Sequence, residues 1–310
     1  MKIDPVTLRS FIAIVEEGSI ARAAIRVHLA PSAVSKRIAE LESHLHTQLL
    51  IRKNRGIEPT VAGRSLVRHA RNILHGLDEL VTEIRDFSSG IRGRVRLFAN
   101  ISSITQFLPH DLKSFLTQHP GIDIDLEEHI SSFTTRAVAE NAADIGIYAQ
   151  ADNEYGLEVF PYRRDQLVLA VPYGHKLSRR RVIKFVDTLD HEFVGYHKGG
   201  AINYLLLRAA SDANRTLKLR FQVTTFEAVF AMVRAGLGIG VLPAGTIGLL
   251  GREPGLRTIR LADAWASRQI KLCVRNRNSL PAAAALLVTH LLSEPDALPA
   301  ISYHDGKLAK

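Results

Sequence analysis

Apolar residues in the first 46 positions recur at the spacing of amphipathic helices. Three such stripes follow one another, formed by Leu8, Phe11, Ile12 and Val15, by Ile20, Ala23, Ala24 and Val27, and by Val34, Ile38, Leu41 and Leu45. Ser19 is a candidate N-cap of the second helix, and Pro31, which fixes its own φ, can open the third. The pattern predicts two short helices joined by a fixed turn, with a preceding helix packed on them.

The face of the third helix opposite its apolar stripe is unusual for a solvated surface. It carries small, hydroxylated or basic residues and no acid, namely Ser32, Ser35, Lys36, Ala39 and Ser43. A helix with one packed face and such an opposite face can enter a DNA major groove, because nothing bulky or negative holds it away. Periodicity alone favours an ordinary helix pair in an all-α protein, so the DNA interpretation depends on the surrounding chain.

A strongly basic hairpin follows the helix pair. Residues 49–60, LLIRKNRGIEPT, have short apolar arms and a turn-prone tip at Lys53, Asn54, Arg55 and Gly56. Residues 19–72 contain ten basic residues and three acids, a surplus of seven positive charges. Such a tip beside a recognition helix would lie on a DNA backbone or enter a minor groove. A hairpin kept basic for solubility is the alternative, but it does not explain why the charge coincides with the helix pair.

Residues 60–88 are predicted to form one long helix. Its apolar residues follow alternating spacings of four and three, in the order Leu66, Ala70, Ile73, Leu77, Leu80, Ile84 and Phe87. This heptad seam must be buried against a partner helix, because the rest of the helix is polar. Packing on its own domain is the alternative, but so long a helix beside so small a domain favours dimerisation with a second copy of the chain. A dimer would present two recognition helices to two half-sites.

Beyond a predicted hinge at residues 88–93, β-rich and helical segments alternate. Strands are expected at 94–100, 122–128, 144–149, 165–172, 193–197, 217–224, 239–243 and 270–276, and helices near 102–119, 132–142, 201–213, 225–235 and 281–293. This alternation predicts parallel sheets covered by helices, and its length favours two lobes over one. Ligands bind outside the carboxyl ends of strands in such sheets, so a cleft between the lobes is the expected site.

Composition narrows the class of protein. Of the 310 residues, 46% are hydrophobic and 23% charged, which is ordinary for a globular protein. No apolar run approaches the roughly 18 residues that span a bilayer, and MKIDPVTLRS lacks the apolar core of a signal peptide. We therefore expect a cytoplasmic protein without membrane contact. The single cysteine, Cys273, excludes an internal disulfide framework and a cysteine-based metal site, and we expect it to be a buried small residue.

Motifs for catalysis or cofactor binding do not fit their required context. Gly236, Gly238 and Gly240 have the spacing GxGxG and precede a strand, the reverse of the order in a dinucleotide-binding turn. His44 and His46 point apart on a helix, and no carboxylate–histidine cluster has ligand spacing. The sequence contains neither a GxSxG elbow nor a Walker loop. We expect no enzymatic activity, no catalytic residue, no cofactor and no bound metal.

The chain resembles the LysR-type transcriptional regulators over nearly its whole length. The resemblance rests on LRSFIAIVEEGSIARAA, SAVSKRIAELESHLHTQLLIR and TVAG near the N-terminus, and on FLPHDLKSFLTQHPGIDIDL, ADIGIYA and AMVRAGLGIGVLP further on. It implies an α+β multidomain protein: a winged helix-turn-helix domain (1–59), a linker and dimerisation helix (60–89), and a two-lobed α/β effector domain (90–310) like type II periplasmic binding proteins. The first lobe would comprise about 91–162 and 268–295, and the second about 163–267.

The resemblance also implies which residues meet DNA. They are Ser32, Ser35, Lys36 and Arg37 on the recognition helix, and Arg52, Lys53 and Arg55 on the wing. Pro31 stands where the family often has glutamine, so an amide contact to a base edge is lost there. Leu50 replaces a common phenylalanine, and Ala30 lacks the N-cap oxygen often found at its position, which weakens the helix start by ~1 kcal/mol.

Candidate effector-binding residues follow the predicted strands of both lobes. They are Asn100, Ser102, Ser103, Ser131, Tyr148, His197, Lys198, Thr224 and Thr225. Each alone is more often a cap or turn residue, but together they cluster at the carboxyl ends of strands. Free N–H groups at the helix start after Asn100 would favour an anion. We therefore expect a small organic anion held by hydroxyl and N–H groups, with Lys198 as a further candidate.

These observations together predict a sequence-specific regulator that binds double-stranded promoter DNA as a homodimer or homotetramer and responds to a small-molecule effector. RNA polymerase is a further candidate partner. Two alternatives stay open at this point. One is a DNA-binding module fused to an α/β enzyme or a transport-type binding protein, and the other is an architectural DNA binder that takes no ligand.

Overall fold

The computed structural model describes residues 3–53, 56–86, 92–249 and 255–293. Its contacts divide the chain near Gly93 into two units, each with its own core. We call the N-terminal one the winged unit and the other the α/β unit. Within the described ranges, no helix is both long enough and apolar enough to cross a membrane.

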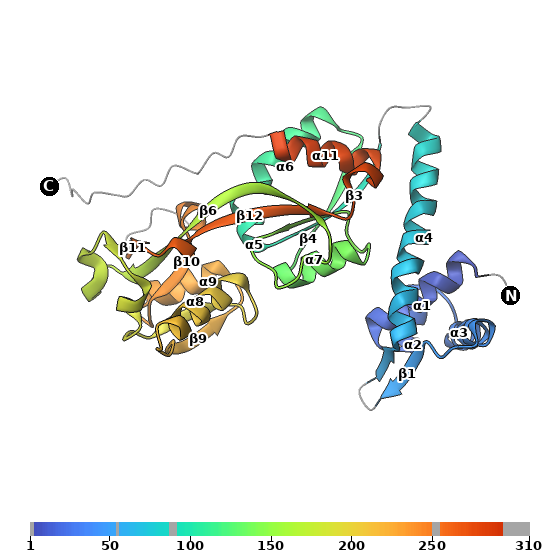
Figure 1. Cartoon of the computed structure of the whole chain (residues 1–310), viewed down its shortest axis with the longest axis horizontal. Helices are drawn as coiled ribbons and strands as arrows, with labels where there is room; N and C mark the ends of the chain where they lie inside the picture. Colours follow the sequence, from blue (N-terminus) through green and yellow to red (C-terminus); the bar gives the residue numbers. More distant parts are fainter. Residues whose placement is uncertain (1–2, 54–55, 87–91, 250–254, 294–310) are drawn as a thin grey trace. The chain divides into compact units, whose positions relative to one another are not determined.

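The winged unit consists of α1 (Pro5–Glu17), α2 (Ile20–Arg26), α3 (Pro31–Leu45), β1 (Leu50–Lys53), β2 (Gly56–Pro59) and α4 (Val61–Asp86) (Figure 1). Asp4 caps α1, because its Oδ1 accepts a hydrogen bond from Thr7 N at 2.8 Å, and Gly18 ends the helix with a φ of 63°. Ser19 and Ala30 occupy the N-cap positions of α2 and α3, but neither side chain makes a capping bond. Ser19 therefore occupies the predicted N-cap position but does not cap the helix through its hydroxyl group.

The three predicted apolar stripes meet in the core of this unit. Its buried members are Phe11, Ala13, Ile14, Ala23, Ala24, Val34, Ile38, Leu41, Leu49 and Val67. Leu45, predicted to share the α3 stripe, is exposed, because the helix ends there and His46 turns left-handed with a φ of 47°. The packed face of α3 therefore runs from Val34 to Leu41, and the opposite face is turned outward.

The hairpin formed by β1 and β2 is fixed to two helices. The Ile57 N–H donates to the Gly18 carbonyl at 2.9 Å, and a Cβ added at Gly56 would lie only 2.7 Å from that same oxygen. On the other side, Glu42 of α3 accepts a hydrogen bond from Leu49 N at 2.7 Å through its Oε1. The wing is thus held by the α1–α2 turn and by the end of α3, which sets its position beside α3.

The first lobe of the α/β unit has the strand order β4-β3-β5-β12-β6. It contains β3 (Gly93–Ala99), α5 (Ile101–Gln106), α6 (Leu108–Gln118), β4 (Ile122–Glu128), α7 (Ser131–Ala139), β5 (Ile145–Tyr148), the first part of β6 (Glu158–Pro172), β12 (Ser267–Val274), the short η4 (Arg277–Ser279) and α11 (Ala282–Ser293). Figure 1 shows α6 and α11 on one face of the sheet and α7 on the other.

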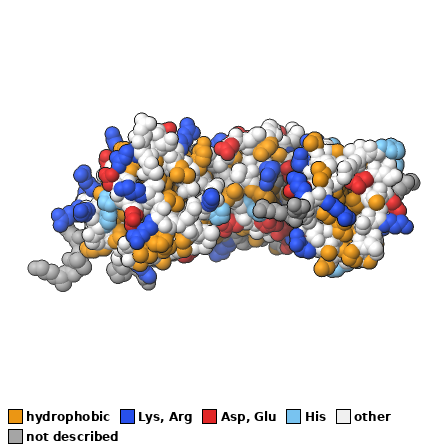
Figure 2. Space-filling model, turned by 90° about the horizontal axis from the view of Figure 1, so that it is seen from below, with side chains coloured by type: hydrophobic (Ala, Val, Ile, Leu, Met, Phe, Trp, Pro, Cys, Tyr) orange, Lys and Arg blue, Asp and Glu red, His pale blue; other side chains and the backbone are white. Residues whose placement is uncertain are grey.

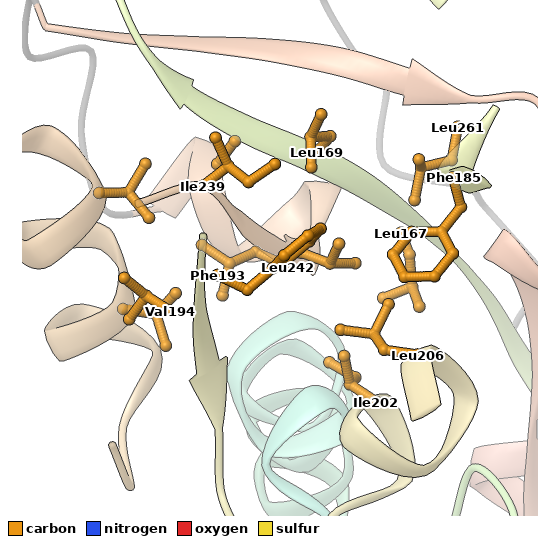
Figure 3. Packing of buried hydrophobic residues seen from close by; sticks show 14 of the residues in the cluster. Leu167, Leu169, Phe185, Phe193, Val194, Ile202, Leu206, Ile239, Leu242 and Leu261 are labelled. Carbon is orange, nitrogen blue, oxygen red and sulfur yellow. The ribbon is translucent and has the colours of Figure 1, made fainter. Parts of the chain in front are cut away.

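The second lobe continues β6 and is built around its own core. It contains η1 (Lys176–Arg179), β7 (Val182–Ile183), η2 (Phe185–Thr188), β8 (Phe193–Tyr196), α8 (Ala201–Asp212), β9 (Leu219–Val223), α9 (Phe226–Arg234), β10 (Gly240–Pro243), α10 (Ala244–Leu249), β11 (Leu256–Leu261) and η3 (Ala264–Ala266). Figure 3 shows how Leu167 and Leu169 of β6 pack with Phe193 of β8 and with Ile202 and Leu206 of α8.

Two strands, β6 and β12, join the lobes. Residues 158–166 of β6 pair with β12, whereas residues 167–172 pair with β10 and β11. The expectation of parallel sheets is correct for β3 with β5 and for β8 with β9, but β12 is antiparallel to both β5 and β6. The sheets are mixed because the chain leaves the first lobe along β6 and returns along β12. The expected two-lobed α/β fold is otherwise confirmed.

Several predicted boundaries are wrong for local reasons. The helix expected at 102–119 is divided at Phe107, because Pro109 in the first turn of α6 has no N–H with which to continue α5. β6 begins at Glu158 rather than Asp165, and the register of β12 shifts between Ile270 and Lys271, where it faces Pro161. That bulge lets a strand contain proline. β7, β11 and α10 are short and were not predicted.

Candidate functional site

The outward face of α3 carries three of the four residues predicted on it. Ser32 and Lys36 are exposed, and Ser35 is half-buried beside them. Lys36 Nζ lies 4.0 Å from Glu40 Oε1, one helical turn away, which is a weak surface pair. This face therefore offers hydroxyl groups and an ammonium group at the start of α3, where no large side chain blocks the approach of another molecule.

Arg37, the fourth predicted residue, is half-buried and contacts the start of α1. Its Nη1 donates to Asp4 Oδ2 and to Thr7 Oγ1, each at 3.1 Å. The Thr7 N–H, together with the Thr7 hydroxyl and the Arg37 guanidinium, holds the pKa of Asp4 below its ordinary value against a smaller opposing effect of burial. Arg37 thus ties α3 to the cap of α1 and has fewer donors left for an outside partner.

The basic side chains of the wing differ in whether an ion pair within the wing holds them. Arg52 is exposed, whereas Lys53 Nζ lies 2.5 Å from Glu58 Oε2 on the facing strand. Arg55 lies outside the described residues. Arg52 and Lys53 share a shallow hollow with Arg22 of α2, which the sequence interpretation missed; its lining residues are Gly18, Ser19, Ile20, Ala21, Arg22, Arg52, Lys53, Gly56 and Ile57. Figure 2 shows Lys and Arg side chains gathered over this end of the winged unit.

The predicted seam of α4 is divided between two environments. Ala70 is fully buried and Leu74 nearly so, in a cluster with Leu8 and Ile12 of α1 against which Leu66 also packs. The other described residues of the seam are exposed: 51% for Ile73, 39% for Leu77 and 54% for Leu80. Val81, next to Leu80, is 50% exposed. The side chain of Ile84 and the whole of Phe87 lie outside the described residues. The alternative of packing on its own domain therefore applies to the first turns of α4 alone.

The α/β unit contains a cavity of about 290 Å³. Residues from both lobes line it: Asn100, Ile101, Ser102, Glu128, His129, Ile130, Ser131, Phe133, Tyr196, His197, Gly200, Ala201, Ile202, Phe226 and Arg268. Most of them lie at or after the carboxyl ends of β3, β4 and β8, whereas Phe226 follows β9 and Arg268 lies near the start of β12. The size lies at the lower end of the roughly 300–1,000 Å³ typical of ligand pockets. The cavity can therefore hold a small molecule between the lobes.

Four of the nine predicted effector-binding residues line this cavity, namely Asn100, Ser102, Ser131 and His197. Ser103 does not, because it is fully buried and donates both its N–H and its hydroxyl to Asn100 Oδ1, at 2.9 and 2.8 Å. The free N–H expected at this position is therefore wrong. Thr224 and Lys198 are outside the lining, and Thr225 caps α9 by accepting a hydrogen bond from Ala228 N at 3.1 Å.

Tyr148, another predicted effector residue, belongs to a separate polar cluster. Its side chain is fully buried, and its hydroxyl donates to Glu154 Oε1 at 2.6 Å. Lys271 Nζ donates to the same oxygen at 2.8 Å. This hydrogen bond from Lys271, followed by that from Tyr148, lowers the pKa of Glu154, while burial raises the pKa of Tyr148 strongly. Tyr148 therefore stabilises the end of β5.

The base of the cavity is formed by Arg268, which no sequence pattern indicated. The residue is 7% exposed and stands directly opposite Asp165 where β12 and β6 pair. Its Nε donates to Asp165 Oδ1 at 2.8 Å, and its Nη2 donates both to Asp165 Oδ2 and, at 3.1 Å, to Ser102 Oγ. Gln106 adds a long contact of 3.4 Å to the same carboxylate. A buried ion pair thus lies where the strands pass between the lobes.

Aromatic and aliphatic side chains form the walls of the cavity. Tyr196 and Phe226 of the second lobe have ring centroids 4.5 Å apart. In the first lobe the His129 ring stacks on Phe133 at 4.2 Å, and its Nε2 lies 2.9 Å from Glu127 Oε2. The sequence interpretation missed these residues, because it sought polar groups after strands and gave no weight to the apolar residues beside them.

The start of α8 supplies further donors to the cavity. Gly200, Ala201 and Ile202 line it, with Gly200 at the N-cap of this twelve-residue helix. The first N–H groups of a helix have no acceptor within it and favour negative charge. Together with the guanidinium of Arg268 they give the cavity hydrogen-bond donors from both lobes.

The described residues support neither a metal site nor a reactive thiol. The described residues include no group of three or more His, Cys, Asp or Glu side chains able to hold a metal ion. Cys273 is buried, as expected, and burial raises the pKa of its thiol to about 12. The thiol is therefore protonated at neutral pH and is a poor nucleophile.

Comparison with protein-family models gives two matches. Residues 6–64 match the bacterial regulatory helix-turn-helix protein, lysR family, and residues 88–296 match the LysR substrate binding domain. Among curated proteins, the RuBisCO operon transcriptional regulator of Allochromatium vinosum is 28% identical, over 93% of this chain and 95% of its own length. The two models together cover both units.

Solved structures share the fold over nearly the whole chain. CbnR, a LysR family regulator, has been determined in complex with its target DNA; it gives a TM-score of 0.66 at 23% identity and covers 93% of this chain and 99% of its own. A full-length OxyR variant from Pseudomonas aeruginosa gives a TM-score of 0.70 at 19% identity, with 94% and 95% covered. These likenesses support the fold of both units.

Proposed function

The chain belongs to the family of LysR-type DNA-binding transcriptional regulators, and from this membership we propose that its hold on promoter DNA changes when a small organic anion enters the cavity of the α/β unit. The structure of CbnR with its target DNA supports the DNA-binding part of this proposal. The anionic character of the ligand is inferred from the residues that line the cavity.

The main support for an anionic ligand is that Arg268 has hydrogen-bond donors left to bind it. A guanidinium has five N–H donors, and those of Nε and Nη2 are used by Asp165 and Ser102. Among the described residues, the one buried side-chain N or O atom without a partner is Asn203 Oδ1, so Arg268 Nη1 is not a buried orphan. Because Arg268 lines the cavity, we infer that Nη1 is the group that it offers to a ligand there. A carboxylate or phosphate could accept from Nη1 and from the start of α8.

The position of Arg268 also connects the ligand to a change of shape. Arg268 and Asp165 pair across the two strands about which the lobes would rotate. Ser102 joins this pair to α5, whose far end reaches the second lobe through Thr105 Oγ1 and Thr246 Oγ1, 3.3 Å apart. An anion that draws the start of α8 toward Arg268 would close the lobes and shift the placement of subunits on DNA.

The test is calorimetric titration of the full-length protein with mono- and dicarboxylates and phosphorylated sugars, followed by footprinting of its promoter with and without any ligand found. At least one anion should bind and alter the footprint. Arg268→Lys should weaken binding at least tenfold, because a single ammonium group cannot replace both the two hydrogen bonds to Asp165 and the contact of Nη1 with the ligand. Binding of neutral compounds only, or an unchanged affinity in Arg268→Lys, would refute the anion.

On the winged unit, we propose that Ser32, Ser35 and Lys36 read the major groove while Arg22, Arg52, Lys53 and Arg55 bind phosphates. Arg37 acts indirectly, by fixing α3 to the cap of α1. Ser35→Ala should change the preference among half-site sequences, measured by competition with a randomised site. Ser211→Ala, an exposed serine near the end of α8 in the α/β unit, is the matched control. An equal loss on all sequences would contradict a reading role for Ser35.

We further propose that the exposed part of the α4 seam pairs with the same part of a second copy. Ile73, Leu77 and Leu80 leave apolar surface in water that a facing copy would cover. Leu66 and Ala70 would then support the seam from inside the winged unit rather than form it. The dimer would bring two winged units to two half-sites.

A further inference from the structure

The cavity between the lobes is lined by two chemically different groups on strands that are not neighbours. The donors already described belong to Arg268 of β12, to Ser102 and to the start of α8. The exposed carboxylate of Glu128, the last residue of β4, also lines the cavity, and β3 and β5 separate β4 from β12 in the sheet. We call the surroundings of Arg268 and of Glu128 the two ends of the cavity. No described residue forms a hydrogen bond or ion pair with the side-chain carboxylate of Glu128. A ligand that only accepts hydrogen bonds would leave this carboxylate without a partner.

Neighbouring groups do not neutralise Glu128. His129, the adjacent residue, directs its Nε2 to Glu127 instead. A second carboxylate, Glu227 in the first turn of α9, adds to the negative charge near Tyr196. Burial first, and then the charges of Glu128 and Glu227, raise the pKa of Tyr196 to about 12, so its phenol stays neutral. This end of the cavity therefore favours a cation and disfavours a second anionic group.

The rest of the cavity lining is largely apolar, and the cavity is small. Ile101, Ile130, Phe133, Ile202 and Phe226 line it, and the whole cavity measures about 290 Å³. Aromatic faces beside a carboxylate also suit an ammonium group, which they attract through their ring quadrupoles. A ligand that fits has an anionic end, a short apolar body and a cationic end.

We propose that the effector is a zwitterion of the amino-acid type, whose carboxylate meets Arg268, Ser102 and the start of α8 and whose ammonium group meets Glu128. This inference rests on the proposed function, because it assumes that the cavity is the effector site. A dicarboxylate of the same length would place like charges together at Glu128, and a neutral ligand would leave both ends unpaired. Glu128 thus selects among the anions that Arg268 admits.

The experiment is calorimetric titration of the full-length protein with the proteinogenic α-amino acids, β-alanine and γ-aminobutyrate. Any amino acid that binds is compared with the acid that lacks its amino group and the amine that lacks its carboxylate. Each truncated analogue should bind at least about tenfold more weakly, because it leaves one charged group of the site without a partner. Glu128→Gln should lower the affinity for the amino acid to that for the deaminated acid, whose own affinity stays the same or rises.

Asp123→Asn is the matched control, because it removes the same charge from the same strand at a residue that does not line the cavity. It should leave both affinities unchanged. The inference is overturned if no amino acid binds, if the deaminated acid binds as tightly as the amino acid, or if Glu128→Gln retains the discrimination. Simple carboxylates that bind and alter the footprint in those cases would leave the proposed function intact, whereas silence of both classes would overturn both.

Discussion

The two units each contain a carboxylate–guanidinium pair, and the pairs differ in burial. In the winged unit, Arg37 and Asp4 lie 3.1 Å apart with side chains 36% and 39% exposed. In the α/β unit, Arg268 and Asp165 are joined by two hydrogen bonds, with side chains 5% and 0% exposed. Arg37 was predicted to bind DNA and Arg268 was not predicted at all. The same chemical pair is a surface brace in one unit and the base of a cavity in the other.

Burial decides what each pair can do. Water screens the exposed pair and weakens it, so its main effect is to orient α3 against α1. The buried pair has lost its hydration, so neither partner can leave without stranding the other. A ligand that reaches Arg268 therefore acts on a rigid element, whereas DNA that reaches the winged unit meets cations that are still largely hydrated. The predictions below test this difference, beginning with the largest expected effect.

Removing the charge of Arg268 should be strongly destabilising. Arg268→Gln leaves the carboxylate of Asp165 buried and unpaired, at a cost of about 3–5 kcal/mol in the free energy of unfolding. The loss is measured by urea unfolding, monitored through the fluorescence of Trp265. Trp265 is the one tryptophan of the chain and lies in the second lobe. The double variant Asp165→Asn with Arg268→Gln should recover more than half of the loss. As a control, Arg164→Gln replaces an exposed residue of β6, the strand that contains Asp165, and should change the free energy of unfolding by about 0.5 kcal/mol or less.

The next effect concerns apolar groups instead of the charged pair. The exposed part of the α4 seam leaves apolar side chains in water. Leu77→Glu combined with Leu80→Glu should raise the dimer dissociation constant by about 100-fold, roughly 2.7 kcal/mol, because two charges would face each other across the seam. Sedimentation velocity measures this change. Val61→Glu, at an exposed apolar residue of the first turn of the same helix, should leave the oligomeric state as it is. A double variant that assembles normally would contradict pairing through α4.

Exposed cations of the wing should have smaller and additive effects. Arg52→Ala should weaken binding to all DNA sequences alike and lower the slope of log affinity against log salt by about one, because one phosphate contact is lost. Lys53→Ala, expected from the sequence to do the same, should lower the slope by less, because Glu58 already competes for its ammonium group. Filter binding or fluorescence anisotropy over a salt series checks both. Equal slopes for the wild type and Arg52→Ala would remove the wing from the interface.

The winged unit was predictable from sequence to a much greater extent than the cavity. Its first three helices and its wing lie within the first sixty residues, so periodicity and charge revealed them together. Two exceptions have different causes: Arg37 pairs with Asp4, 33 residues away in the chain, and Leu45 turns to solvent because α3 ends beside it. The cavity gathers residues from 100 to 268, and strand ends indicated only Asn100, Ser102, Ser131 and His197. Arg268 follows no turn or motif, and only the pairing of β12 with β6 brings it opposite Asp165.

The smallest expected effect concerns the exposed pair and depends on pH. The pKa of Asp4 is lowered in the folded state, so its charge stabilises the fold at pH values above its ordinary pKa of 3.8. This stabilisation is lost as the pH falls through the lowered pKa.

The variant Asp4→Asn keeps a good N-cap but loses the ion pair with Arg37, so near pH 7 the substitution should cost about 0.5 kcal/mol or less in the free energy of unfolding. Wild type and variant should become equally stable as the pH falls well below 3.8. Urea unfolding of the full chain from pH 7 down to about pH 2 measures the difference, and Asp4→Ala, which also removes the cap, should retain a deficit at every pH. A constant difference between wild type and Asp4→Asn would mean that Arg37 does not depend on the charge of Asp4, and the two pairs would then differ in kind rather than in burial.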